Sequence, residues 1–216
     1  MFPYLRPKLV HEHQRLLVSL VDLETRKNLF AAIEPDPNPK YPDLAHLSPV
    51  AIHFLAGILY GLPDIMPLFA PTINSYKRLV ENFWAPVTVS WGLEHRTASI
   101  RVISPPVSPA QSTRFEIRTP GADANPHYVL GAILALGMYG VENELELPVP
   151  PLEKIEGAST ANVPGERLPN SLKEATAKFM ADTSIARKVF GDEFVDHFGG
   201  TRVHEVKLWE EAVTDW

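Results

Sequence analysis

The stretch that decides the fold of this sequence is RFEIR, residues 114–118. Successive side chains of a β-strand point to opposite faces, so its three charged residues would share one face and its two apolar residues the other. The apolar face would pack on a core, and the Arg-Glu-Arg face would suit a metal-dependent site for an anionic substrate. A half-exposed edge strand carrying a row of surface ion pairs would explain the same pattern.

Two further strands are predicted before this stretch. Residues 87–91 (VTVSW) and 98–103 (ASIRVI) are rich in β-branched residues and alternate with a period of two. The proline-rich segment 104–109 separates the second of them from RFEIR. Three strands so close in sequence predict an antiparallel sheet.

Helices are predicted on both sides of these strands. Ser48-Pro49 and Asn125-Pro126 each supply an N-cap side chain followed by a proline suited to the first helical position. The second helix is apolar on almost every side, which is typical of a buried helix. Amphipathic helices follow the connector 148–169. The predicted class is therefore α+β, an antiparallel sheet covered by helices, with a helical C-terminal tail.

The composition is that of a mildly acidic globular protein. Its 216 residues, 45% of them hydrophobic, can bury the core of one domain. The net charge of −6 and the absence of a Lys/Arg cluster argue against nucleic acid as a partner. Without cysteine, a metal would depend on His and carboxylate, which suits Mg²⁺ or Mn²⁺. No signal-peptide pattern and no membrane-spanning stretch is present, so a cytoplasmic location is expected.

Four arginines fall in or beside the predicted strands and need a common explanation: Arg78, Arg96, Arg101 and Arg118. A guanidinium binds carboxylate or phosphate through a two-pronged fork. Four in one cavity would repel each other unless polyanions filled it, as a nucleoside triphosphate and a carboxylate substrate would. The alternative is four separate surface arginines whose aliphatic stems lie along the core.

Several long motifs resemble the glutamine synthetase family. They are PTINSYKRL (71–79), APVTVSWGLEHRTASIRV (85–102), RFEIRTPGADANPHYVLGAILA (114–135) and the closing VTDW (213–216), in the family's own order. They resemble the C-terminal half of its catalytic domain. The resemblance implies a partial catalytic domain at 27–216, preceded by a divergent arm at 1–26.

Position by position, the resemblance implies an ATP-dependent ligase that joins glutamate to ammonia or an amine. Glu116 would bind the divalent metal, Mg²⁺ or Mn²⁺, and Arg78 and Arg118 would hold the substrate. Arg101 would bind the nucleotide phosphates, and Arg96, with Arg118, would act in catalysis. In this chemistry ATP phosphorylates a γ-carboxylate and the amine then displaces phosphate, a transfer that metal and arginine charges stabilise.

One departure from the family concerns the flap over the acyl phosphate. The family usually carries a glutamate six residues after the arginine of YKR, and here that position is Trp84. A tryptophan cannot take a proton, but it can stack on a larger amine. Members with this replacement resemble fungal developmental-signalling proteins and γ-glutamyl-amine ligases.

A second departure concerns the family's His-x-His motif, whose first histidine binds metal and whose second contacts nucleotide. His11 and His13 have the right spacing. Counting back from Ser19, however, places Arg15 and Leu17 at the histidine positions. Either four residues are inserted here, or this segment is not the family's motif.

A third departure is the missing β-grasp domain, which in the family precedes this motif along with most metal-binding glutamates. We therefore expect the isolated chain to be inactive. It would be a truncated ligase domain, or else a non-catalytic binding or assembly module, or an incomplete gene model. Family members form rings, so we expect exposed apolar surface and either self-association or dependence on a full-length partner.

Overall fold

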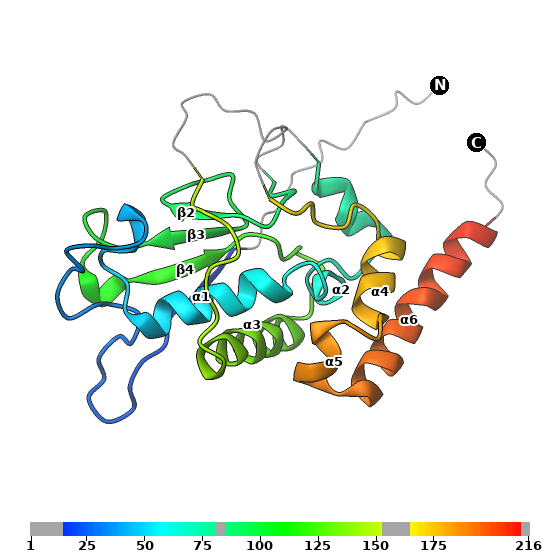
Figure 1. The fold of residues 1–216 in the computed structure, drawn as a ribbon. Coiled ribbons are helices and arrows are strands. Elements are labelled where there is room, and N and C mark those ends of the chain that lie inside the picture. Colours follow the sequence, from blue (N-terminus) through cyan, green and yellow to red (C-terminus); the bar gives the residue numbers. More distant parts are fainter. Residues whose placement is uncertain (1–14, 81–84, 153–164, 213–216) are drawn as a thin grey trace, which may run out of the picture.

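The computed structural model describes residues 15–80, 85–152 and 165–212 of the chain (Figure 1). A four-stranded sheet forms one side of the molecule, and helices pack beside it and extend away from it (Figure 1). The strands, in the spatial order β1-β4-β3-β2, are β1 (Leu16–Val18), β4 (Arg114–Ile117), β3 (Ile100–Ile103) and β2 (Trp91–Leu93). The predicted α+β class is confirmed.

The sheet is mixed instead of wholly antiparallel. β4 runs antiparallel to both of its neighbours, but β2 and β3 are parallel. Parallel strands usually need a long crossover connection. Here residues 94–99 suffice because β2 is very short, and Glu94 starts the return with a φ of 55°. The prediction of an antiparallel sheet is therefore wrong for this one pair.

The two edges of the sheet differ in how they are covered. The strand predicted at 87–91 is wrong over most of that range, because β2 begins only at Trp91 and Thr88 forms an isolated bridge with Arg167. These residues still hydrogen bond to two later segments. Val89 N donates to Glu166 O at 2.8 Å, and Leu152 N donates to Trp91 O at 2.8 Å. The edge formed by these residues is thus partly paired. Among the described residues, no strand pairs with the outer edge of β1.

Part of the predicted N-terminal arm belongs to the sheet. β1 pairs with β4 along its whole length, from Leu16 opposite Ile117 to Val18 opposite Phe115. The domain boundary placed after residue 26 stays a prediction.

Six α-helices and three short 3-10 helices accompany the strands in the described residues. The α-helices are α1 (Pro49–Gly61), α2 (Met66–Phe69), α3 (Pro126–Glu142), α4 (Leu172–Met180), α5 (Ile185–Phe190) and α6 (Asp192–Glu211). The 3-10 helices are η1 (Pro42–Leu44), η2 (Ile73–Arg78) and η3 (Ala110–Ser112). The last three α-helices form the C-terminal tail that the sequence predicts.

Both predicted cap-and-proline starts are confirmed. Ser48 Oγ accepts a hydrogen bond from Ala51 N at 3.1 Å, and Asn125 Oδ1 accepts one from His127 N at 2.9 Å. Each bond satisfies one of the backbone donors that a helix leaves unpaired in its first turn.

The apolar face of the sheet packs on α1 through an aromatic cluster. Phe30 lies between the two, with its ring centroid 4.6 Å from that of Phe115 on β4 and 5.2 Å from that of Phe54 on α1. Phe115 and Ile117 are fully buried. This packing fixes the apolar side of β4 and so leaves its charged side facing away from the core.

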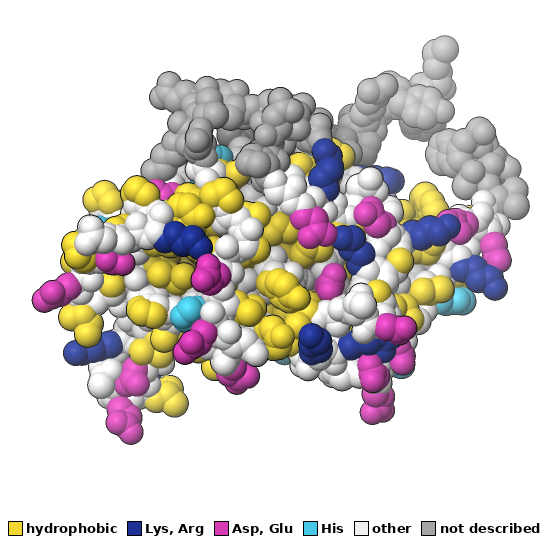
Figure 2. Space-filling model, viewed as in Figure 1, with side chains coloured by type: hydrophobic (Ala, Val, Ile, Leu, Met, Phe, Trp, Pro, Cys, Tyr) yellow, Lys and Arg dark blue, Asp and Glu magenta, His cyan; other side chains and the backbone are white. Residues whose placement is uncertain are grey.

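Helix α3 is only half covered. Its inner face packs on α1, where Gly57 and Gly140 bring the two backbones close together. Its outer face exposes Leu130, Leu134 and Met138 by 42, 44 and 41%. The prediction that this helix is buried is wrong for this face, because α3 packs with α1 on one side only. Figure 2 shows apolar side chains gathered over these two helices.

The described part of the chain contains no helix that is both long and apolar enough to cross a membrane. The oligomeric state, for which self-association was expected, stays a prediction.

Candidate anion-binding site

The charged face of the sheet is centred on Glu116 in the middle of β4. Arg118 Nη1 donates to Glu116 Oε1 at 2.6 Å, and Arg101 Nη1 donates to Oε2 at 3.2 Å. The pairing of β3 with β4 sets Arg101 directly opposite Glu116. Glu116 and Arg118 are only 4% and 6% exposed. The shared face predicted from the alternation of RFEIR is therefore present, and it is buried instead of lying along the surface.

Two more charged residues join this face. Arg15 Nε lies 3.7 Å from Glu116 Oε1. The pairing of β1 with β4 sets Leu17 opposite Glu116, so Arg15, two residues earlier, falls on the same face. Glu94, in the turn after β2, forms an ion pair with Arg101 Nη2. Sequence reasoning gave Glu94 no role, because only the parallel return of the chain brings this turn beside Arg101.

Arg78 reaches the site from η2. Its Nη2 donates to Thr119 O at 2.5 Å, which places it beside Arg118 in the chain segment that leaves β4. Burial lowers the pKa of the Arg78 guanidinium; nearby Asp123 opposes this shift and Arg118 adds to it. Arg78 Nη1 is buried and has no hydrogen-bond partner among the described residues. A buried cation with an unused donor is a natural place for an anionic ligand.

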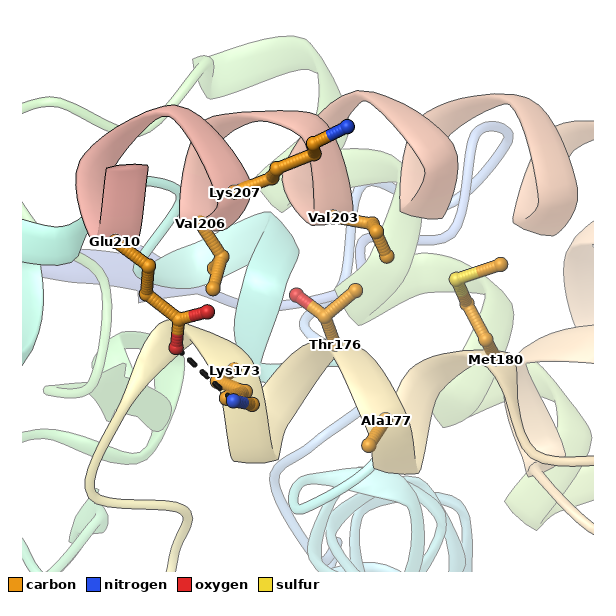
Figure 3. Close-up of a pocket in the computed structure, with 8 residues that line it drawn as sticks. All are labelled: Lys173, Thr176, Ala177, Met180, Val203, Val206, Lys207 and Glu210. Carbon is orange, nitrogen blue, oxygen red and sulfur yellow. Dashed lines mark hydrogen bonds and ion pairs between the residues drawn. The ribbon is translucent and has the colours of Figure 1, made fainter. Parts of the chain in front are cut away.

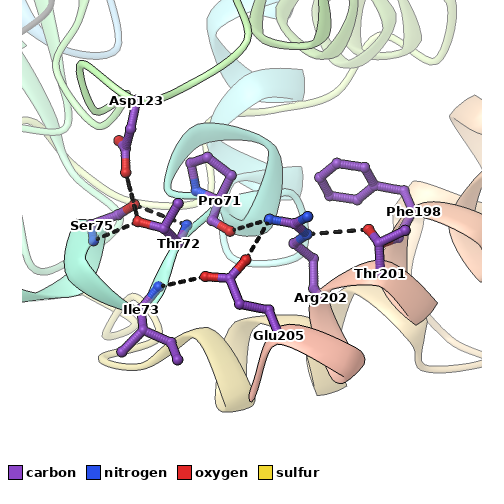
Figure 4. A network of polar contacts seen from close by, with 9 residues as sticks. All are labelled: Pro71, Thr72, Ile73, Ser75, Asp123, Phe198, Thr201, Arg202 and Glu205. Carbon is purple, nitrogen blue, oxygen red and sulfur yellow. Dashed lines mark hydrogen bonds and ion pairs between the residues drawn. The ribbon is translucent and has the colours of Figure 1, made fainter. Parts of the chain in front are cut away.

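The turn that presents Arg78 is held by a capping box and a carboxylate (Figure 4). Thr72 and Ser75 cap the turn reciprocally, and both hydroxyls donate to Asp123 Oδ2, at 2.7 and 2.5 Å. Asp123 comes from the corner between β4 and α3. The segment after the strand therefore fixes the segment that carries Arg78.

Helix α6 holds the same turn from its other side (Figure 4). Ile73 N donates to Glu205 Oε1 at 3.2 Å. Arg202 Nη1 donates to Pro71 O at 2.6 Å and to Glu205 Oε2 at 2.9 Å. The contacts of Glu205 with Ile73 and of Arg202 with Pro71 join residues more than a hundred positions apart in the sequence, and no local pattern indicated them.

Not every predicted site residue joins the cluster. Arg96 is exposed in the turn between β2 and β3, and forms no ion pair with the described residues. Its predicted role in catalysis stays a prediction. His11, His13 and Trp84 lie outside the described residues.

The described residues do not provide a set of ligands for a divalent metal. No group of three or more His, Asp or Glu side chains among them is placed to hold one. Both oxygens of Glu116 face guanidiniums. A hard divalent ion takes about six oxygen ligands, so this donor set does not fit it. The metal role implied for Glu116 stays a prediction.

A separate groove of about 290 Å³ lies between α4 and α6 (Figure 3). Its walls are mostly apolar, and an ion pair of 2.9 Å between Lys173 and Glu210 lies at its end. None of the predicted site residues lines it. The lining residues are Lys173, Thr176, Ala177, Met180, Val203, Val206, Lys207 and Glu210.

The fold and the site define an α+β domain that gathers guanidiniums around one buried carboxylate. The family described as "Glutamine synthetase, catalytic domain" matches residues 9–216. The chain belongs to the glutamine synthetase family.

Several relatives are similar over most of this chain. A "Type-1 glutamine synthetase 2" of Dictyostelium discoideum is 43% identical over 90% of the chain and 35% of its own length. A "Gamma-glutamylethanolamide synthetase GlnA4" of Streptomyces coelicolor is 40% identical over 79% of the chain and 35% of its own length. A "Glutamate--isopropylamine ligase" of Pseudomonas sp is 38% identical over 83% of the chain and 37% of its own length.

A solved structure described as "Apo GmaS without ligand" matches with a TM-score of 0.71 and 29% identity. The match covers 94% of this chain and 42% of that one. The chain thus spans little more than a third of the length of the curated relatives it matches.

Proposed function

We propose that this chain supplies the substrate- and phosphate-binding half of a glutamine synthetase-type ligase site. In that reaction ATP would phosphorylate the γ-carboxylate of glutamate, and an amine would then displace the phosphate. The observation that carries the proposal is that Arg101 and Arg118 pair with the buried Glu116 carboxylate. Arg78, from η2, hydrogen bonds to the backbone of Thr119, the residue after Arg118.

The charges of this face favour anions. Four guanidiniums (Arg15, Arg78, Arg101 and Arg118) face three carboxylates (Glu94, Glu116 and Asp123), which leaves positive charge in excess. Arg78 would hold a carboxylate of glutamate, with Arg118 beside it. Arg101 would contact the phosphates of ATP, and exposed Arg96 could close on the transferring phosphoryl group.

The second substrate in this proposal is an organic amine in preference to ammonia. Two of the similar proteins are named for joining ethanolamine or isopropylamine to glutamate. Trp84 stands where the family usually has its flap glutamate. An aromatic ring can stack on an alkylammonium ion, whereas a carboxylate suits a small ammonium ion better.

The proposed half-site would depend on groups from another chain. Mg²⁺ or Mn²⁺ would enter with the nucleotide or be held by residues of a full-length partner in a ring. The described residues alone do not supply its ligands.

The cytoplasmic location expected from the sequence stays a prediction.

The test is isothermal titration calorimetry with ATP and L-glutamate, together with an assay of γ-glutamyl hydroxamate formation. We expect the wild-type chain to bind these ligands and Arg78→Ala to weaken binding about tenfold or more, because a charged hydrogen bond is lost. Lys77→Ala is the matched control, since the Lys77 ammonium lies over the Trp209 ring instead of in the site. Hydroxamate formation is expected to stay at the level of Glu116→Gln, with Mn²⁺ or Mg²⁺ present.

Two results would contradict this account. Equal affinity of wild type and Arg78→Ala for these ligands would show that the cluster of Arg78, Arg101 and Arg118 is not the binding site. Hydroxamate formation by the wild type well above the Glu116→Gln level would show that the chain is a complete enzyme.

The second candidate function is a non-catalytic binding or assembly module. The enclosure of Glu116 by guanidiniums favours it, because the carboxylate is then not free for a metal. This candidate predicts that the chain binds a full-length relative without changing its turnover. The ligase half-site predicts instead that Arg78→Ala alters the turnover of such a mixed assembly.

A further inference from the structure

Glu116 is enclosed by positive charge on three sides. Arg118 Nη1 lies 2.6 Å and Arg15 Nε 3.7 Å from its Oε1, while Arg101 Nη1 lies 3.2 Å from its Oε2. A divalent cation bound to either oxygen would lie close to at least one guanidinium. In a site this buried the repulsion would be weakly screened.

Arg15 is the residue that completes this enclosure. The pairing of β1 with β4 puts Arg15 and Leu17 on the face of Glu116. Those two positions are the ones that counting back from Ser19 assigns to the family's two histidines. At the first of them this chain therefore places a cationic side chain, and not a metal ligand, next to Glu116.

Unused donors belong to Arg101, which pairs with the enclosed carboxylate, and to Arg78 and Thr119, which meet just after Arg118. Arg78 Nη1 and Arg101 Nε are buried and have no hydrogen-bond partner among the described residues. Thr119 Oγ1, fully buried next to the carbonyl that Arg78 contacts, is also without a partner there. Buried donors without acceptors are costly, so an incoming oxyanion would gain these bonds.

We propose that Arg15 takes the place of the divalent cation at Glu116, so that this face binds an oxyanion, carboxylate or phosphate, without a metal. The inference rests on the proposed function for the location of the site, but it changes the chemistry of that site. The guanidiniums of Arg15, Arg101 and Arg118 both neutralise Glu116 and supply the charge that a metal would otherwise bring to the ligand.

The test titrates the purified chain with inorganic pyrophosphate, and separately with L-glutamate, in EDTA and in excess Mg²⁺. The two titrations distinguish a phosphate from a carboxylate ligand. We expect binding of one or both in EDTA, with an affinity that Mg²⁺ improves by less than about twofold for glutamate. Because Mg²⁺ also complexes pyrophosphate in solution, only the titration of pyrophosphate in EDTA measures metal-free binding of that ligand.

Two variants are expected to change the metal-free binding affinity in opposite directions. Arg15→Ala, at a partly exposed position, should weaken metal-free binding about tenfold. Glu116→Gln should strengthen it, because the guanidiniums lose their internal partner and become available to the ligand. Lys27→Ala, which removes one exposed positive charge elsewhere, should leave binding unchanged.

Any of the following outcomes contradicts the inference. Binding that appears only with Mg²⁺ or Mn²⁺, or Mn²⁺ binding that Glu116→Gln abolishes, would restore Glu116 as a metal ligand and leave the proposed function intact. Equal affinity of Arg15→Ala and wild type would remove Arg15 from the site. No binding in either solution would overturn the proposed function itself, and the inference with it.

Discussion

Replacing Gly140 with alanine is expected to lower the free energy of unfolding by about 3 kcal/mol, because an added side chain has no room there. A Cβ at this position would lie 2.2 Å from the carbonyl oxygen of His53 and 2.7 Å from Cα of Gly57. Both are backbone atoms of α1 that no rotamer change can move. The two helices would have to separate, and the contact that supports the apolar side of the sheet would loosen.

Gly131→Ala is the matched control for this prediction. Gly131 lies in the same helix, and a Cβ there meets nothing within 4 Å. Alanine has the higher helix propensity, so this variant should be unchanged or stabilised by up to about 1 kcal/mol. Urea unfolding followed by circular dichroism measures both variants. Similar stabilities for the two would show that α1 and α3 do not pack as closely as described.

Glu116→Ala should destabilise the fold by about 3–5 kcal/mol, the usual result of removing one partner from a buried ion pair. Arg118 and Arg101, with side chains only 6% and 17% exposed, would lose their internal counter-ion. Saturating pyrophosphate should restore part of the stability, since an oxyanion can take the place of the carboxylate. Thermal unfolding with and without pyrophosphate measures both effects.

The control breaks an ion pair at the surface. Glu146→Ala removes the 2.9 Å contact with Lys40, and both side chains are well exposed. Solvent screens such pairs, so no measurable change in stability is expected. A loss for Glu116→Ala no larger than for Glu146→Ala would mean that Glu116 is not buried among guanidiniums.

Local patterns predicted the parts of the fold that depend on neighbouring residues. The alternation in RFEIR placed Glu116 and Arg118 on one face, and cap-and-proline pairs located the starts of α1 and α3. These features follow from the period of a strand and from unpaired backbone donors at a helix end. The positions of Arg78 and Arg101 near the predicted strands singled them out, and the resemblance to a family then implied roles for them, which stay predictions.

Features that depend on long-range pairing were not predicted. The parallel pairing of β2 with β3 brings Glu94 to Arg101, and β1 brings Arg15 to Glu116. The contacts of Arg202 and Glu205 with the η2 turn depend on where α6 docks. Burial of α3 was predicted from composition, which does not reveal that one face of this helix stays partly exposed.

The cluster of Arg78, Arg101 and Arg118 is proposed as the ligand site. NMR of isotope-labelled arginine side chains, during titration with pyrophosphate and ATP, shows whether these guanidiniums contact the ligand. We expect the Nε–H signals of Arg78, Arg101 and Arg118 to move with increasing ligand. The signal of Arg187 in α5, which pairs with Asp192 and Asp196, should not move, because α5 lies away from the sheet (Figure 1). Movement at Arg187 with the other three unchanged, or no movement at any arginine, would contradict the account.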